Sequence, residues 1–598
     1  MDGDTLGKDR NGMVTAMGDF SSMASALEAG AQRVAAWADI LDRINIFPVA
    51  DGDTGRNLVL TLRPLKQSGA DPEALSRALL FAARGNAGNI AARFLSGLLG
   101  YPHSGSLLSS CETGRDLAYQ AVHIPQPGTM LSLLDALTSS LKKYPPEPTG
   151  DWPGPVVKEL QDAVRNTPNQ LPALMEAGVV DSGALGMYMF LDAFFHTLVG
   201  REAKVGMMIE NLKGRLHVSR RWKKRAGEGF CVDMMIEAGK SGSLEAGAFS
   251  GLGDSMVAIS DGELVKVHLH VRSREELQER ARSIGNVVAW GADDLDEQTR
   301  RFHPLGADPA VHLMTDAAGS LTREDAMELN ITLLDSYVNI GDQSIPETYV
   351  EPGFLYQAMR RGVKVSTSQA SIFERHENYR KALGMHERVL YLCVGSFYTT
   401  NYQVAGDWKE REGLEGRMII ADSGTASGSL GLAAILTARF ALRTDDFDSV
   451  VSFARESAKA CREFIFLDKL AFLAAGGRMS KTGAFLGDML HTKPVVSPTR
   501  EGAKKIATVR SRDDQVRFAV SALEKALSGS KNPVLMLQYT DNRSWIRSQV
   551  APLLERRFPE AEILLRPISL TASAHMGPGT WAVAFLGRLP RPDTHARK

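Results

Sequence analysis

Several features that would quickly assign a sequence to a class of protein are scarce in this chain. It contains only four cysteines, spread over positions 111, 231, 393 and 461, and no Cys-x-x-Cys pair. A disulfide framework is therefore not expected, and the pattern is typical of a reducing compartment such as the cytoplasm. No apolar run reaches the roughly 18 residues of a membrane span, and the polar N-terminus lacks the apolar core of a signal peptide.

A strong charge of either sign is also lacking. The formal net charge is −1, so no overall basic field indicates nucleic acid as a partner. The composition, with 44% hydrophobic and 23% charged residues, is that of an ordinary globular protein. A chain of 598 residues is too long for one hydrophobic core, and about three or four domains are expected.

Hydrophobic periodicity divides the chain into three parts. Residues 14–200 show helical spacing without a convincing alternating strand, which predicts an all-α domain. Residues 201–303 predict a small α/β domain, and residues 310–590, after a linker at 302–309, predict an α/β domain with a largely parallel sheet. The expected strands lie at 230–237, 255–260, 264–271, 312–315, 388–394, 417–421, 533–538 and 582–586, and expected helices at 275–285, 449–464 and 515–526.

The most informative loop covers residues 45–57, between an apolar run and an expected helix. Asp51 and Asp53 are separated by a single glycine there. The loop could be a polar turn with Asp53 or Thr54 as the N-cap of the helix. It could equally be a divalent-cation site, because hard cations prefer carboxylate oxygens and glycines let the backbone approach the ion and its phosphates. The residues alone leave both interpretations open.

Three further loops open expected helices, at residues 83–89, 128–130 and 177–186. The first reads Ala-Arg-Gly-Asn-Ala-Gly-Asn, and the last contains Asp181 and Ser182. A glycine-rich turn at a helix start offers free N–H groups and the positive end of the helix dipole, which suit a phosphate group. Each loop could also be an ordinary helix connection with Asp181 or Ser182 as N-cap.

In order and spacing, these four loops resemble the nucleotide-binding domain of DhaL-type dihydroxyacetone kinases, and most closely the bacterial fatty acid kinase branch. The resemblance implies an eight-helix barrel over residues 14–200 that binds ATP with two magnesium ions. It implies Asp51 and Asp53 as catalytic magnesium ligands. The family's serine in the second loop is Ala87 here, so one hydroxyl contact to phosphate is missing. The remaining residues implied around ATP are Asn45, Thr54, Asn57, Arg84, Gly85, Asn86, Gly88, Gly128, Thr129, Asp181 and Gly183.

The middle part contains His268-Leu-His270 on an expected strand. A period of two places both imidazoles on one face, as in a zinc site, although a strand with two surface histidines fits as well. The middle domain of fatty acid kinases has a similar pattern, which is Gly229-Phe-Cys231 followed by Val265-Lys-Val-His268-Leu-His270 here. The resemblance implies zinc ligands Cys231, His268 and His270, with Asp233 or water as the fourth.

A basic segment, His-Val-Ser-Arg-Arg-Trp-Lys-Lys-Arg at residues 217–225, precedes this middle part. A solvated connector is the simplest interpretation. Contact with ATP, with an acidic lipid headgroup or with a neighbouring domain is the alternative.

The last part carries polar segments at the ends of expected strands, where α/β folds bind ligands. Residues 315–321, 366–371, 395–402, 477–497 and 574–580 resemble motifs of the DegV family, a two-lobed α/β fold. The resemblance implies a long-chain fatty acid in a buried tunnel. Its carboxylate would be held by Thr367 or Ser368, by Ser396 and by His575, and His575 could instead be a satisfied core histidine. Arg478 could pair with a phosphate or pack locally.

Together the resemblances predict a cytoplasmic fatty acid kinase that phosphorylates a fatty acid bound in its own chain and supplies acyl phosphate to phospholipid synthesis. Expected partners are an acyltransferase that accepts acyl phosphate, a second copy in a homodimer and a transiently contacted membrane surface. A first alternative, supported by Ala87, is a fatty-acid-binding or sensing protein with a weakened kinase domain. A second is a kinase for a small hydroxylated substrate, but those kinases have histidine where this chain has Thr54.

Overall fold

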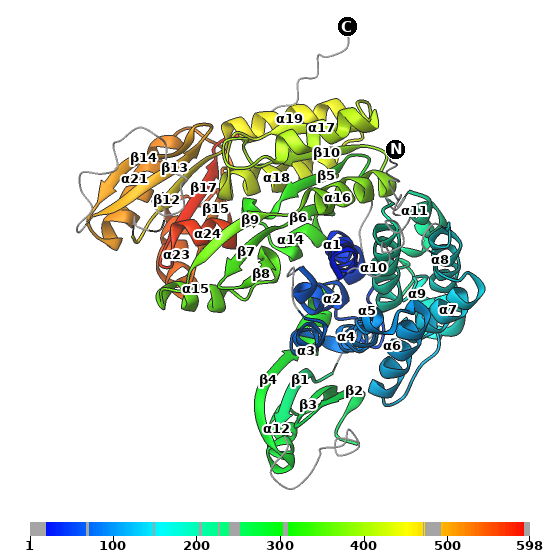
Figure 1. Ribbon diagram of the computed structural model, residues 1–598. Coiled ribbons are helices and arrows are strands. Elements are labelled where there is room, and N and C mark those ends of the chain that lie inside the picture. Colours follow the sequence, from blue (N-terminus) through cyan, green and yellow to red (C-terminus); the bar gives the residue numbers. More distant parts are fainter. Residues whose placement is uncertain are drawn as a thin grey trace, which may run out of the picture. The chain divides into compact units, whose positions relative to one another are not determined.

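The computed structural model describes residues 20–66, 71–147, 150–201, 206–224, 228–237, 251–302, 309–469, 472 and 492–590. They belong to two compact units, Met1–Pro304 and Leu305–Lys598 (Figure 1). The expected fold classes are confirmed, because a helical region is followed by a small α/β region and then by an α/β region with a parallel sheet. No helix among these residues is long and apolar enough to cross a membrane.

The helical region of the first unit is built around α10 (Ser182–Leu198), whose residues from Ser182 to Phe195 are all buried. The long helix α1 (Phe20–Arg43) lies against it, and the buried pair Arg33 and Asp192 joins the two helices. The other helices are α2 (Thr54–Leu62, continued by η1, Arg63–Lys66), α3 (Pro72–Ala82), α4 (Gly85–Leu98), α5 (Tyr101–Ser104), α6 (Leu107–Ala121), α7 (Met130–Lys143), α8 (Pro153–Gln170), α9 (Pro172–Ala177) and α11 (Gly206–Leu212, then η2, Lys213–Arg215).

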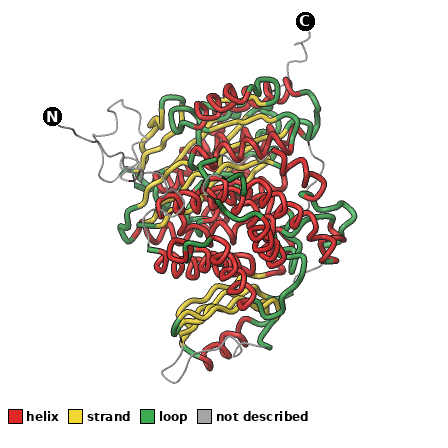
Figure 2. The backbone as a smooth tube through the Cα atoms, turned by 45° about the vertical axis from the view of Figure 1, so that its right-hand side comes forward, coloured by secondary structure: helices red, strands yellow, loops and turns green. Residues whose placement is uncertain are grey.

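An antiparallel sheet of order β2-β3-β1-β4 follows, visible as the yellow strands near the bottom of Figure 2. Its strands are β1 (Phe230–Glu237), β2 (Asp254–Asp261), β3 (Leu264–Val271) and β4 (Asn286–Asp294), with helices α12 (Arg274–Ile284) and α13 (Leu295–Arg301). On β1 and β3 every second residue packs towards α12 and forms the core, namely Val232, Met234, Ile236, Val265, Val267, Leu269 and Val271. The residues between them lie on the opposite face, which carries the candidate metal ligands.

Two connecting segments differ from the expected solvated linkers. Phe302 is buried, and a Cβ at Gly52 would come within 2.9 Å of its ring. The Lys224 Nζ donates to the Phe302 carbonyl at 2.7 Å, and the Trp222 ring lies edge-on to the Phe302 ring at 6.3 Å. The basic segment therefore contacts its own unit, at least up to Lys224. Arg225 and residues 303–308 of the expected linker lie outside the described residues.

The second unit has three sheets. The order β11-β10-β5-β6 is parallel throughout, as expected, whereas β14-β13-β12-β17-β15-β16 is mixed with only β15 and β16 parallel, and β8-β7-β9 is antiparallel. The strands are β5 (His312–Asp316), β6 (Ile331–Leu334), β7 (Ser336–Ile340), β8 (Gln343–Pro346), β9 (Val365–Gln369), β10 (Val389–Cys393), β11 (Met418–Asp422), β12 (Arg462–Phe466), β13 (Lys493–Thr499), β14 (Gly502–Val509), β15 (Val534–Tyr539), β16 (Glu562–Pro567) and β17 (Trp581–Leu586).

Helices cover the faces of these sheets. They are α14 (Arg323–Glu328), α15 (Pro352–Arg360), α16 (Ile372–Met385), α17 (Asn401–Glu412), α18 (Ser427–Ala441), α19 (Phe447–Ala460), α21 (Arg512–Ala526), α22 (Arg543–Trp545), α23 (Ala551–Arg557) and α24 (Leu570–Met576). The helix expected at 449–464 was predicted too long, because α19 ends at Ala460 and β12 begins at Arg462. Pairing of β12 with β13 and β17 determines the conformation there.

Candidate functional site

The loop between α1 and α2 holds Asp51 and Asp53. Gly52 between them has φ +69°, a left-handed conformation that glycine adopts without strain. The Asn45 side-chain amide donates to Asp51 Oδ1 at 2.5 Å, so Asn45 orients this carboxylate. Burial, and then the charge of Asp53, raise the pKa of Asp51 well above its ordinary value, and burial also raises the pKa of Asp53. Two buried carboxylates that repel each other are a suitable ligand pair for a divalent cation.

Asp42, which the sequence interpretation missed, supports this loop from α1. Its Oδ1 accepts hydrogen bonds from the backbone of Gly55 at 2.6 Å and of Arg56 at 3.1 Å, in the first turn of α2. A carboxylate at a helix start compensates the unpaired N–H groups and the helix dipole. Asp42 therefore fixes the start of α2 directly after the two candidate metal ligands.

The turn before α4 is the second part of the site. Gly85 has φ +61°, and a Cβ there would come within 2.4 Å of the Asn57 side-chain nitrogen. The Arg84 backbone N–H donates to Thr61 Oγ1 at 3.1 Å. The first N–H groups of a helix have no intrahelical acceptor. Those of Asn86 and Ala87 belong to this first turn, and both residues line the cavity described next. This turn could therefore bind phosphate through its backbone.

The remaining two loops complete the wall. Asp181 caps α10 by accepting from the Ala184 N–H at 2.7 Å, and burial raises its pKa to about 6. Ser182 Oγ donates to Thr54 Oγ1 at 3.1 Å, which joins the start of α10 to the start of α2. The hydroxyl of Thr129, at the start of α7, donates to the Gln126 carbonyl at 2.8 Å.

The loops meet at one cavity of about 220 Å³. Of the residues expected around ATP, those lining the cavity are Asn45, Asp51, Asp53, Thr54, Asn57, Gly85, Asn86, Thr129, Asp181 and Gly183. Among the described residues, Arg84, Gly88 and Gly128 lie in the same loops without lining it. The sequence interpretation missed its apolar part, which includes Phe47, Pro48, Ile90, Ile124, Met130 and Leu131. Apolar side chains next to buried carboxylates and helix starts could take the base and the phosphates of a nucleotide.

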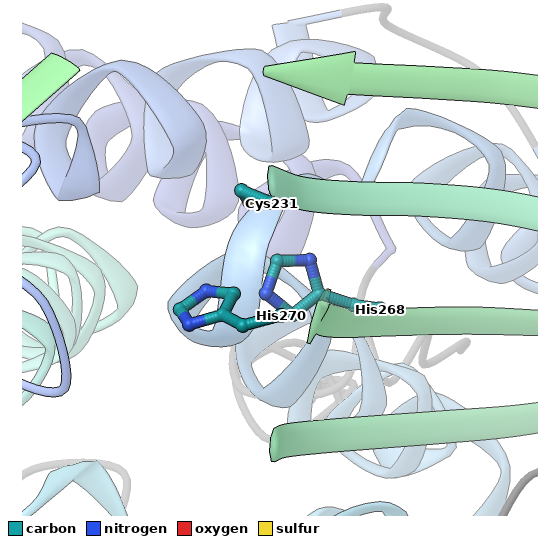
Figure 3. A group of neighbouring side chains, drawn as sticks. All are labelled: Cys231, His268 and His270. Carbon is teal, nitrogen blue, oxygen red and sulfur yellow. The ribbon is translucent and has the colours of Figure 1, made fainter. Parts of the chain in front are cut away.

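Cys231, His268 and His270 line the same cavity from the middle sheet. Their ligand atoms all lie within 4.8 Å of one another, and Figure 3 shows the two imidazoles of β3 beside Cys231 of β1. Cys231 lies directly opposite His270 in the β1–β3 pairing. His268 is 1% exposed, and its Nε2 has no hydrogen-bond partner among the described residues. A buried imidazole nitrogen without a partner, next to a thiol and a second imidazole, fits a metal ion such as zinc.

The protonation of these groups agrees with that use. Burial, and then the neighbouring His268, lower the pKa of His270 to about 3, so this imidazole is neutral. Burial, and then the Asp53 charge, raise the pKa of the Cys231 thiol. A metal ion would compensate this by stabilising the thiolate.

Asp233, considered above as a fourth ligand, has other contacts. Its Oδ1 lies 3.3 Å from His268 Nδ1, and its Oδ2 accepts the Gly85 N–H at 3.2 Å. Burial alone would raise the pKa of Asp233, but His268 and then Lys266 hold it well below its usual range. Such a carboxylate orients a metal-binding histidine through its second nitrogen.

The second unit has a smaller cavity of about 170 Å³, and its wall is mostly apolar. Thr367 Oγ1 and His575 Nε2 are 3.0 Å apart on this wall, next to Ser368 and Thr399. Ser396 does not line this cavity. It is exposed, and its hydroxyl donates to Asp422 at 2.8 Å. Arg478 lies outside the described residues. The apolar lining residues are Ala318, Val394, Tyr398, Ala426, Ile465, Val496, Pro498, Ala503, Ala572 and Met576.

Two buried carboxylates support the polar end of this cavity. Glu347 accepts hydrogen bonds from the N–H and the hydroxyl of Thr571, at 3.0 and 2.8 Å, in the helix that carries His575. Asp316 accepts from Tyr391, from the Val394 N–H and from Asn401, and so fixes both ends of the loop between β10 and α17. Burial raises the pKa of Glu347 to about 8 and that of Asp316 to about 6.

Comparison with known families assigns each of these regions. Residues 48–196 match the DAK2 domain, residues 227–302 match the middle domain of fatty acid kinase A-like proteins, and residues 310–588 match the DegV family, described as uncharacterised proteins. The chain thus carries the DAK2 and middle domains of a fatty acid kinase A-like protein, followed on the same chain by a DegV-family domain.

Individual relatives cover only parts of the chain. An uncharacterized protein of Staphylococcus haemolyticus is 31% identical over 300 residues, which are 45% of this chain and 54% of that protein. One of Staphylococcus saprophyticus is 30% identical over 311 residues, 47% of this chain and 56% of that protein. The chain therefore spans about half the length of the curated relatives it matches.

Solved structures resemble the chain over a similar share of its length. A Thermus thermophilus DegV family protein, described for its fatty acid binding, is 22% identical and has a TM-score of 0.43, covering 46% of this chain and 99% of that one. DegV from Bacillus subtilis, described as a fatty acid binding protein, is 17% identical with a TM-score of 0.43, covering 47% and 99%.

Proposed function

We propose that the protein is an ATP-dependent kinase that phosphorylates the carboxylate of a fatty acid bound in its own DegV-family unit. The observation that carries the proposal is the presence of two complementary cavities in one chain. One is lined by paired carboxylates and by the N-termini of helices, and the other is apolar with Thr367 and His575 on its wall. The first suits a nucleotide and its metal ions, and the second suits a chain with a polar head.

In the first cavity, Asp51 and Asp53 would hold two magnesium ions, which compensate charge on the β- and γ-phosphates. The N–H groups of Asn86 and Ala87, together with the Thr129 hydroxyl, would donate to phosphate oxygens. Cys231, His268 and His270 would hold zinc, with the remaining coordination position open towards the cavity.

The chemical step needs little from the protein beyond position. A fatty carboxylate is ionised at neutral pH, so one of its oxygens attacks the γ-phosphorus directly. The bond from that phosphorus to the β–γ bridging oxygen breaks, ADP leaves with the electron pair, and no proton is transferred. Thr367 and His575 would bind and orient the carboxylate, so His575 is assigned to binding rather than to proton abstraction. A covalent tether would also keep the bound fatty acid at a high effective concentration, within the chain or between two chains of a dimer.

The test is an incubation of the full chain with ATP, magnesium and oleate in the presence of hydroxylamine, which converts acyl phosphate to a hydroxamate. We expect hydroxamate and ADP in equal amounts from the wild-type protein. Neither should form with Asp51→Asn, which keeps the shape of the side chain. The absence of hydroxamate from the wild-type protein, with metals and lipid demonstrably bound, would overturn the proposal.

One residue favours a second candidate function, a fatty-acid-binding or sensing protein with a weakened kinase domain. Ala87 presents a methyl group in the cavity where related kinases have a hydroxyl. The variant Ala87→Ser separates the two. An increase in hydroxamate formation would mean that the missing hydroxyl limits an existing kinase. If no hydroxamate forms with either protein while lipid copurifies with both, the binding function stands instead.

A further inference from the structure

The face of the middle sheet that is turned away from α12 carries more than the three candidate metal ligands. On β3, Lys266 precedes His268 and His270 at a spacing of two, and on β1, Asp233 follows Cys231 at the same spacing. In the antiparallel pairing, Asp233 lies directly opposite His268. Lys266 and Asp233 are thus the neighbours of the metal ligands on the same face.

Both of these side chains contact the turn before α4. The Lys266 Nζ is buried and donates to the carbonyl oxygens of Leu80, at 2.9 Å, and of Ala83. Asp233 accepts the Gly85 N–H at 3.2 Å and the Asn89 side-chain amide at 3.3 Å. The middle domain therefore holds this turn on both sides of Arg84, by its carbonyl groups on one side and by an N–H group on the other.

This arrangement has a direct effect on phosphate binding. Asp233 uses the Gly85 N–H, so the donors left for a phosphate at this helix start are those of Asn86 and Ala87. It also places a carboxylate next to the positive end of α4, where it would repel phosphate unless its own charge is balanced. His268 Nδ1 and Lys266 are the groups that balance it. A metal ion on His268 Nε2 fixes the proton on Nδ1 and makes that N–H a stronger donor to Asp233.

We propose that Asp233 and Lys266 are positioning residues for the phosphate-binding turn, and that a metal ion at Cys231, His268 and His270 acts on this turn through the contact between His268 and Asp233. Metal occupancy of the middle domain then sets the nucleotide affinity of the helical domain. The inference rests on the proposed nucleotide site, but it concerns regulation of that site and not the reaction performed there.

The experiment measures the affinity of the full chain for Mg-ADP by calorimetry, with zinc bound and after removal of zinc by a chelator that is then dialysed away. Zinc content is determined by elemental analysis. We expect removal of zinc to weaken binding to the wild-type protein by about tenfold, the usual effect of losing a hydrogen bond to a charged group. Asp233→Asn and Lys266→Met should weaken binding by a similar factor with zinc bound.

The decisive comparison combines the two changes. If Asp233 carries the effect, zinc removal should have little further effect on Asp233→Asn, since the contact is already lost. An equal loss in both proteins would overturn the proposal. Asp261→Asn is the matched control, because Asp261 pairs with Arg77 across the same domain boundary at an exposed position away from the turn. Its affinity should stay within about twofold of the wild type.

A measurement on the wild-type protein alone guards against a variant that misfolds. Amide hydrogen exchange of residues 84–89 should become faster when zinc is removed, because the turn loses a fixed contact. Unchanged exchange would overturn the inference. A wild-type protein that carries zinc but does not bind Mg-ADP would contradict the proposed function instead, so the two failures can be distinguished.

Discussion

The two cavities of this chain are built in different ways. The cavity of the first unit lies where loops at helix starts meet a sheet face, and single charged or N–H groups dominate its chemistry. The cavity of the second unit lies between sheets and helices, and apolar side chains dominate its wall. A site made of a few charges depends on each of them, whereas a site made of apolar area distributes its binding free energy over many residues. Substitutions should therefore affect the two cavities to very different extents.

The largest effect is expected from the metal loop. Asp51→Ala should reduce acyl phosphate formation by about 10³-fold or more, because the charge on the transferred phosphoryl group is then no longer compensated. Oleate affinity should stay within about twofold, since the change is confined to the other cavity. Hydroxamate formation and displacement of a fluorescent fatty acid measure the two quantities. Asp116→Ala, which removes an exposed ion pair with Arg115, is the control. An active Asp51→Ala protein would remove the basis for the metal assignment.

An intermediate effect is expected at the polar end of the apolar cavity. The double variant Thr367→Val and His575→Ala should weaken oleate binding by about 10- to 100-fold, the loss of one or two hydrogen bonds to a charged group. Affinity for Mg-ADP should not change. Ser396→Ala is the sharper comparison, because Ser396 bonds to Asp422 and lies outside the cavity. A larger loss from Ser396→Ala than from the double variant would show that the fatty acid binds elsewhere.

The smallest effect is expected on stability, through Glu347. Burial raises the pKa of Glu347 from 4.5 to about 8, so the folded protein keeps a proton that the unfolded chain has lost. Stability is therefore highest below the unfolded value and falls as pH rises from 4.5 towards about 8. Glu347→Gln has no such proton to lose.

Calorimetry at two pH values checks this effect. Near pH 5.5 the variant should unfold at nearly the wild-type temperature, and near pH 9 it should unfold higher by about 3–8 °C. The relevant transition is the one that oleate shifts upwards. Glu328→Gln, at an exposed position of α14, should show no difference between the two pH values. A Glu347→Gln variant that behaves identically at both pH values would mean that this carboxyl is already ionised near neutrality.

The sequence predicted the regular elements best where one face of each is buried. The strands expected at 230–237 and 264–271 match β1 and β3 to the residue, because strict alternation of core and outward residues defines them. It failed at 461, where no glycine or proline separates α19 from β12 and the apolar pattern continues across the boundary. Strand pairing with distant residues decided the structure there, and a local pattern cannot contain that information.

The same limit applies to the sites. Asp51, Asp53 and the glycine turns were found because the residues of each lie together in sequence. Asp42 was not, since its partners lie 13 and 14 residues further on and a single carboxylate in a helix resembles a surface residue. Asp233 was placed on the correct face of its strand. Its contacts with His268 and with Gly85, 148 residues away, depend on how the sheet packs against α4.

The alternation of β3 has a consequence for how this region could change during evolution. Lys266, His268 and His270 alternate with the core residues Val265, Val267 and Leu269. Replacing one of these residues alters one contact at a time. Deleting a single residue within the strand would shift one side of it by one position and exchange the two faces there, so that valines meet the nucleotide cavity and charged groups enter the core. Length in this strand should therefore be preserved more strictly than any individual side chain.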